Sequence, residues 1–194
     1  MIQAGDPESK TASDTASLGS GDVGYTIPAE FNPKFIHKKG ALAAARKGDE
    51  VNPKKESSGC QFYIVTGQVF NEEQLLDVEQ RMKDARLTNI FNSLAQKHIK
   101  MRRAGDNDGL MELQNKLEEE AYKVMEKEEP VRFTPEQIQA YTTVGGAPHL
   151  DGEYTVFGEV VDGMDVIDRI QKVKTNRKDR PEENIRILKA TVEE

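Results

Sequence analysis

Cysteine, tryptophan and long apolar runs are scarce or absent in this 194-residue chain. Its single cysteine, Cys60, excludes an internal disulfide framework and a zinc site built from several cysteines. No run of roughly 18 apolar residues occurs, so a membrane-spanning segment is not expected. The chain has 27 Lys and Arg against 34 Asp and Glu, a formal charge of -7, and it contains no basic tract. Because nucleic-acid binding depends mainly on neutralising phosphates, nucleic acid is not an expected partner.

Glycine is nearly absent from residues 71–140, where only Gly105 and Gly109 of the 15 glycines occur. This charge-rich window predicts helices, whereas the glycine-rich flanks predict strands and turns. We therefore expect a discontinuous β-domain, residues 1–70 and 141–194, interrupted by a helical insertion over 71–140.

The insertion carries signals for two amphipathic helices and a short third one. Asn71 and Gln74 predict a capping box at the start of the first helix, and the loop 105–109 separates it from the second. Pro130 ends the second helix, and Pro135 begins the third. The first apolar stripe comprises Leu75, Val78, Met82, Ala85, Leu87, Ile90, Phe91 and Leu94. The second comprises Leu110, Leu113, Leu117, Ala121, Val124 and Met125. A short loop between two such helices predicts an antiparallel hairpin.

The flanks contain short β-rich runs separated by turn residues. Strands are predicted within 61–67, 154–161 and 184–192, and a short helix is predicted over 164–173. Short strands with Gly-rich turns favour a sandwich or a barrel.

Five blocks of the flanks carry a family resemblance. They read MIQAGDP (1–7), GSGDVGYTIPAEF (19–31), GALAAAR (40–46), SGCQFYI (58–64) and LDGEYTVFGEV (150–160). In this order they resemble the motifs of the cyclophilin-type peptidyl-prolyl cis-trans isomerases. The chain is identified as a bacterial member of that family with a helical insertion.

The resemblance implies a mainly β fold, a closed antiparallel β-barrel with an inserted α-helical hairpin. In the family, the opening strands, the first helix and an arginine of the active site precede the motif found here at Met1. We therefore expect an N-terminally incomplete barrel, a fragment of a longer protein whose remaining strands come from another segment or chain. An incomplete barrel would have unpaired strand edges.

The activity implied is cis-trans isomerisation of Xaa–Pro bonds, with proline-containing polypeptides as partners and with no cofactor or metal ion. The resemblance assigns Gln3 and Tyr63 to catalysis. It assigns substrate binding to Met1, Ala45, Arg46, Gln61, Phe62, His149, Leu150 and Tyr154.

Within this set, an apolar pocket for proline would be formed or backed by Met1, Phe62, Tyr63 and Leu150. Neighbours on a strand face opposite sides, so only one of Phe62 and Tyr63 lines the pocket, and the resemblance favours Tyr63. Gln3 would hydrogen-bond substrate backbone, whereas Ala45 and Arg46 would line the groove through their main chain. His149 stands where some relatives have Trp, which predicts weak cyclosporin binding.

Two other histidines, His37 and His98, are expected on the solvated surface.

Because the family arginine is absent from this sequence, a second functional hypothesis is a proline-peptide-binding or chaperone-like module that lacks catalysis. A third is an assembly role for 71–140, and a fourth is that this insertion only packs on itself. Self-association is predicted through 71–140 or through the open barrel edge. The sequence by itself suggests a location in the cytoplasm. A location in the periplasm or cell envelope is expected instead if a lost N-terminal segment carried a signal.

Overall fold

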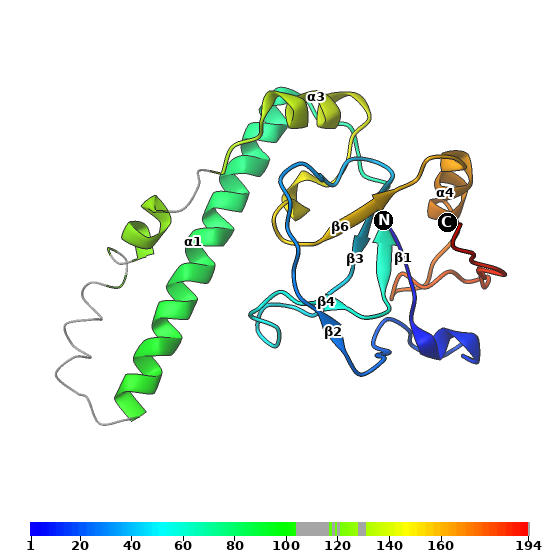
Figure 1. Cartoon of the computed structure of the whole chain (residues 1–194), viewed down its shortest axis with the longest axis horizontal. Helices are drawn as coiled ribbons and strands as arrows, with labels where there is room; N and C mark the ends of the chain where they lie inside the picture. The colour runs from blue at the N-terminus through cyan, green and yellow to red at the C-terminus, as the bar shows by residue number, and fades with distance from the viewer. Residues whose placement is uncertain (104–116, 118, 120, 128–130, 194) are drawn as a thin grey trace. The chain divides into compact units, whose positions relative to one another are not determined.

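The computed structural model describes residues 1–103, 117, 119, 121–127 and 131–193. The chain divides into two compact units, each described here by itself (Figure 1). Met1–Phe70 and Gln139–Glu194 form the first, called the β-unit, and Asn71–Ile138 forms the second, called the helical unit.

Two antiparallel sheets make up the framework of the β-unit. The larger has the strand order β1-β5-β3-β6, and the smaller pairs β2 with β4 (Figure 1). The strands are β1 (Ile2–Ala4), β2 (Thr26–Ile27), β3 (Ala41–Ala44), β4 (Ser57–Ser58), β5 (Phe62–Ile64) and β6 (Val156–Glu159). The antiparallel pairing expected from the resemblance is therefore present.

A closed barrel is not seen in the part of the chain that the structure describes. There, β1 and β6 are the outer strands of the larger sheet, and they do not pair with each other. The strands have two to four residues, whereas the helix α1 (Glu72–Arg103) has 32. The description "mainly β" is therefore not confirmed.

The core of the β-unit forms where a large ring meets small side chains. Tyr63 on β5 lies opposite Ala43 on one neighbouring strand and Gln3 on the other. Ala43 is fully buried and Tyr63 is 2% exposed. The alanines of β3 leave room for the tyrosine ring at the usual spacing of paired strands.

Two turns of the β-unit approach each other through glycines. Gly146 and Gln68 exchange both backbone hydrogen bonds, at 2.9 and 3.2 Å. A Cβ on Gly146 would lie 2.3 Å from the backbone oxygen of His37. Only a residue without a side chain allows this approach.

The helix α4 (Met164–Gln171) confirms the predicted helix near residue 164, and it contacts β1. The expected strand within 184–192 is wrong, because this segment has no strand structure. Its apolar side chains stay exposed, 94% for Leu188 and 95% for Val192. A strand needs a neighbouring backbone for its N–H and C=O groups, and an alternating sequence does not supply one.

Two helices of the insertion begin as predicted. At the start of α1, the Asn71 N–H donates to Gln74 Oε1 at 2.9 Å, and the Gln74 N–H donates to Asn71 Oδ1 at 2.8 Å. The helix α3 (Pro135–Thr143) has the same reciprocal pair between Thr134 and Gln137. Each pair satisfies N–H groups that have no partner inside the helix.

The inward face of α1 includes most of the first predicted stripe, with Leu75 at 2% exposure. Ala85 and Phe91 are exceptions, because both are exposed. His98 is also part of this face: it is 6% exposed, so the expectation of a solvated residue is wrong. It lies four residues after the half-buried Leu94, and that spacing keeps it on the same side of the helix.

Parts of the predicted hairpin, the loop 105–109, Leu110, Leu113 and Pro130, lie outside the described residues. Among the helices that the structure does describe, none combines the length and the apolar character needed to cross a membrane.

Candidate active site

Aromatic and apolar side chains of the expected site meet around Tyr63. The Tyr63 and Tyr154 rings contact edge to face, with centroids 5.7 Å apart and planes at 84°. Leu150, Ala45 and Tyr154 are partly buried and pack against the core cluster that contains Tyr63. The structure therefore brings four of the expected site residues together, with Tyr63 buried and the other three nearer the surface.

A buried histidine that the sequence analysis placed on the surface lies beneath this cluster. His37 is 0% exposed, and its Nε2 lies 3.0 Å from the Tyr63 hydroxyl. Its Nδ1 lies 2.9 Å from Asp151 Oδ1. The expectation of a solvated His37 is wrong, because its ring has polar partners inside the protein that replace water.

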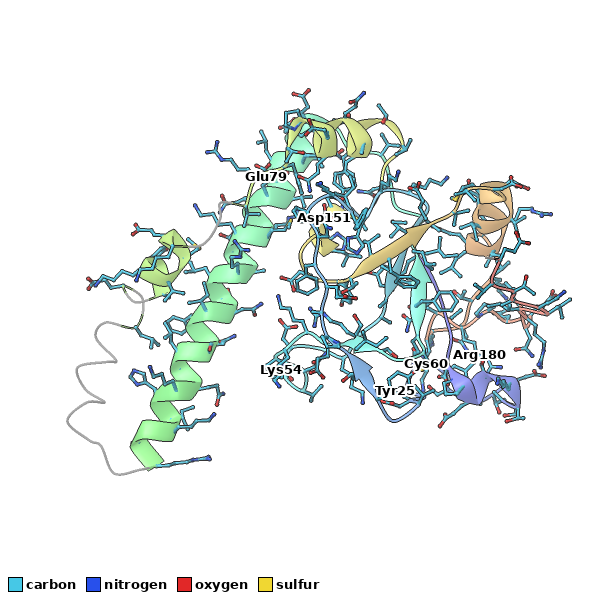
Figure 2. All side chains as sticks on the ribbon, viewed as in Figure 1. Tyr25, Lys54, Cys60, Glu79, Asp151 and Arg180 are labelled. Atoms are coloured by element: carbon cyan, nitrogen blue, oxygen red, sulfur yellow. The ribbon has the colours of Figure 1, made fainter. Side chains whose placement is uncertain are left out.

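Asp151 and Tyr141 complete the buried group. The Tyr141 hydroxyl donates to Asp151 Oδ2 at 2.6 Å, and the backbone N–H of His37 donates to Asp151 Oδ1 at 2.9 Å. Figure 2 labels Asp151, directly after the short helix η2 (Pro148–Leu150). The sequence offered one signal for this residue, its place in the Leu-Asp-Gly block, and none for Tyr141.

Burial raises the pKa of Tyr63 and of Tyr141, and the nearby Asp151 raises the pKa of each hydroxyl further. Both hydroxyls therefore keep their protons over the ordinary pH range and act as hydrogen-bond donors.

Two glutamines form the polar side of the candidate site. Gln3 Nε2 donates to Gln61 Oε1 at 2.8 Å. Gln61 is 8% exposed, and its own Nε2 donates to the backbone oxygens of Gly19 at 3.2 Å and Gly21 at 2.7 Å. Gln61 thus orients the exposed Gln3, whose second amide N–H and amide oxygen point to no partner among the described residues.

The glycine loop that holds Gln61 is fixed in turn by Asp6. Its carboxylate accepts from the N–H groups of Glu8 at 2.8 Å, Gly19 at 2.6 Å and Gly21 at 3.2 Å. Burial opposes ionisation of Asp6, but these three donors outweigh it and hold its pKa below the usual value.

Arg46 is tied to the protein by its side chain. Nε donates to the Glu153 backbone oxygen at 2.8 Å, and the terminal nitrogens donate to Lys47 O, Asp49 and Glu153 Oε2. The guanidinium also lies over the Tyr154 ring, 4.6 Å from its centroid. Because most of its N–H donors are engaged, this guanidinium is poorly placed to serve a substrate.

Three expected residues lie apart from this cluster or at its border. Phe62 lines a depression of about 220 Å³ together with Ala44 and Phe157, and Tyr63 is not part of its lining. Met1 is 66% exposed and is not part of the buried cluster. His149 precedes Leu150, and its pKa is lowered by desolvation and further by the nearby His37.

The described groups suit non-covalent binding of a peptide. The half-buried apolar side chains offer a surface for an apolar ring, and the Gln3 amide offers a donor and an acceptor for a backbone.

Comparison with known proteins identifies the family. The sequence model of the family described as "Cyclophilin type peptidyl-prolyl cis-trans isomerase/CLD" matches residues 1–85 and 100–192, which is most of the chain.

Individual relatives match over shorter stretches. The chain is 50% identical over 54 residues to the peptidyl-prolyl cis-trans isomerase CYP71 of Arabidopsis thaliana, covering 28% of this chain and 9% of that protein. It is 46% identical over 56 residues to the peptidyl-prolyl cis-trans isomerase-like 1 of Emericella nidulans, covering 29% and 35%. The chain thus matches only a minor part of these relatives' lengths. They come from a plant and a fungus, and the bacterial origin stays a prediction.

The family match covers well over half of the sequence and contains all five blocks that carried the resemblance. The chain therefore belongs to the cyclophilin-type peptidyl-prolyl cis-trans isomerase family.

Proposed function

We propose that this chain binds Xaa–Pro segments of polypeptides and accelerates the cis-trans isomerisation of their peptidyl-prolyl bonds. The observation that carries the proposal is the cluster of Leu150, Tyr154 and Ala45 around Tyr63. It joins residues from distant parts of the chain into one apolar surface, and the family match supplies the reaction.

The reaction needs no nucleophile and no cofactor. Rotation about the bond loses amide resonance, against a barrier of about 18–20 kcal/mol. A catalyst must therefore bind the twisted amide more tightly than either planar isomer.

In this proposal the half-buried Leu150 and Tyr154 hold the proline ring, and Tyr63 supports them from the core. Gln3, oriented by Gln61, hydrogen-bonds the backbone beside the proline. Met1 and His149 would border the groove, and Ala45 and Arg46 would line it through their main chain. Phe62 would back the same strand from its other face, and it lines the depression together with Gln61.

A second candidate is a module that binds proline peptides without accelerating isomerisation. The side-chain bonds of Arg46 favour this alternative, because they leave its guanidinium poorly placed to donate to the proline nitrogen. A structure that binds both planar isomers well, without a preference for the twisted amide, would give affinity but no rate increase.

The test is two-dimensional exchange NMR on an Ala-Pro peptide with the wild type, Leu150→Ala and Leu188→Ala. Leu188 is 94% exposed, so its truncation is a matched control. We expect the wild type and Leu188→Ala to accelerate cis-trans exchange, and Leu150→Ala to lose at least tenfold, about 1.4 kcal/mol, of that effect. Peptide line broadening without faster exchange would favour the binding module. Equal rates in all three proteins would reject Leu150 as a pocket residue.

A further inference from the structure

The partners of His37 determine the hydrogen-bonding roles of its two ring nitrogens when the ring is neutral. Asp151 has only acceptor atoms when ionised, so the His37 Nδ1 at 2.9 Å carries a proton and donates it. In the neutral ring the other nitrogen, Nε2, is then an acceptor, and the Tyr63 hydroxyl at 3.0 Å donates to it.

The ring of His37 also has little freedom to turn. Asp151 Oδ1 accepts from both the ring and the backbone N–H of His37, and Asp151 Oδ2 accepts from Tyr141. Rotating the His37 ring would break its bonds to Asp151 and Tyr63 in a fully buried place, where water cannot replace them.

The fixed ring acts on the candidate site through Tyr63, and it also contacts Tyr154 edge to face, with centroids 6.5 Å apart and planes at 81°. His37 and Tyr63 lie nearly parallel, with planes at 15° and centroids 6.1 Å apart. Tyr63 then contacts Tyr154 edge to face, and Arg46 lies over the Tyr154 ring. The plane of the half-buried Tyr154 thus depends on a series of contacts that begins at Asp151, which is one of the residues labelled in Figure 2.

We propose that His37 is a positioning residue, which fixes the ring planes of Tyr63 and Tyr154 through its hydrogen bond to the Tyr63 hydroxyl. Its effect on catalysis rests on the proposed function, whereas its effect on Tyr63 rests on the geometry alone. Burial raises the pKa of Tyr63, which keeps the donating proton in place across the working pH range.

The experiment compares full-length His37→Phe, His37→Gln, Tyr63→Phe and the double variant His37→Phe/Tyr63→Phe. Phe keeps a ring of similar size without hydrogen-bonding atoms, and Gln keeps a side-chain acceptor within reach of Tyr63. Two readouts are used: the ¹³Cζ resonance of Tyr63 in tyrosine-labelled protein, assigned by its loss in Tyr63→Phe, and kcat/KM for the Ala-Pro peptide.

We expect His37→Phe to shift the Tyr63 resonance and to lower kcat/KM about tenfold, chiefly through kcat, because misplaced groups weaken transition-state binding. His37→Gln should restore most of the wild-type position of the Tyr63 resonance and most of the wild-type kcat/KM. The double variant should be no slower than the slower single variant, because both substitutions remove the same hydrogen bond between His37 and Tyr63.

An unshifted Tyr63 resonance in folded His37→Phe would overturn the proposal, and so would effects on kcat/KM that simply multiply in the double variant. If His37→Phe does not fold, Tyr63→Phe removes the same hydrogen bond by deleting its donor. A Tyr63→Phe protein with the kcat/KM of the wild type would then overturn the proposal. A wild type that does not isomerise the peptide defeats the proposed function instead. The Tyr63 resonance then decides the positioning role by itself.

Discussion

Asp6 is a single carboxylate that holds the glycine loop behind the two glutamines. Three backbone N–H groups point at it, and a Cβ on Gly21 would lie 2.0 Å from its Oδ1. The loop is thus shaped around the charge, and the orientation of Gln61 depends on that loop.

Asp6→Asn should lower the free energy of unfolding at pH 7 by about 2 kcal/mol, because hydrogen bonds to a charged acceptor weaken. The folded pKa of Asp6 is depressed, so its charge stabilises the protein above the unfolded value of about 4, and this is lost as pH falls through the lower folded pKa. The difference between wild type and variant should therefore shrink on acidification below about pH 4.

Urea unfolding from pH 7 down to pH 3 measures this difference. Asp165→Asn is the control, because Asp165 is 81% exposed and its ion pair with Arg169, 3.9 Å long, is the only one it makes among the described residues. A stability gap for Asp6→Asn that stays constant with pH would contradict the assignment.

Some residues of the candidate site could be predicted and others could not. Tyr63, Leu150 and Tyr154 lie in blocks whose order resembles the family. His37 and Asp151 interact across 114 positions, and no local pattern links them. A polar residue with a buried partner cannot be told from a solvated one by its neighbours in sequence.

At the scale of elements, the paired turns at Gln68 and Gly146 depend on the absence of a side chain. Gly146→Ala would place its Cβ 2.3 Å from the His37 backbone oxygen and 2.6 Å from the Tyr141 ring. Neither atom belongs to the end of a flexible side chain, so backbone must move.

We expect Gly146→Ala to destabilise the protein by at least about 3 kcal/mol, through overpacking and loss of the turn bonds. Gly48→Ala is the matched control, because apart from its chain neighbours no atom of the described residues lies within 4 Å of a Cβ there. Thermal unfolding by circular dichroism compares the two. A Gly146→Ala protein as stable as Gly48→Ala would show that the turns separate at little cost.

Helix starts were predictable because their signals are local. Asn71 with Gln74 and Thr134 with Gln137 satisfy backbone groups within four residues. The strand expected within 184–192 failed because pairing needs a distant partner, which the alternation of apolar residues does not encode.

At the scale of the whole molecule, the chain leaves and re-enters the β-unit at neighbouring points. The Phe70 N–H donates to the Tyr141 backbone oxygen at 3.0 Å. Residues 71–140 are therefore proposed to be removable as a block, since a short linker can join these two ends.

A variant with 71–140 replaced by a short Gly-Ser linker should stay folded and keep the proposed acceleration of peptide exchange within about threefold. Circular dichroism, size-exclusion chromatography and peptide exchange measure fold, association and activity. If the wild type self-associates and this variant does not, the association belongs to the insertion, whereas loss of folding would show that the β-unit needs residues 71–140.

The pairing of β3 with β6 has a consequence for the order of events during synthesis. Ala41 pairs with Glu159, so the β6 side of β3 stays unpaired on the ribosome until more than half of the chain has followed it, although β5 can pair with its other side earlier. The helical unit is made of consecutive residues and is complete before β6 is translated. Because nascent domains fold as units from the N-terminus, α1 can form before the larger sheet is complete, while the β6 side of β3 stays open to chaperones.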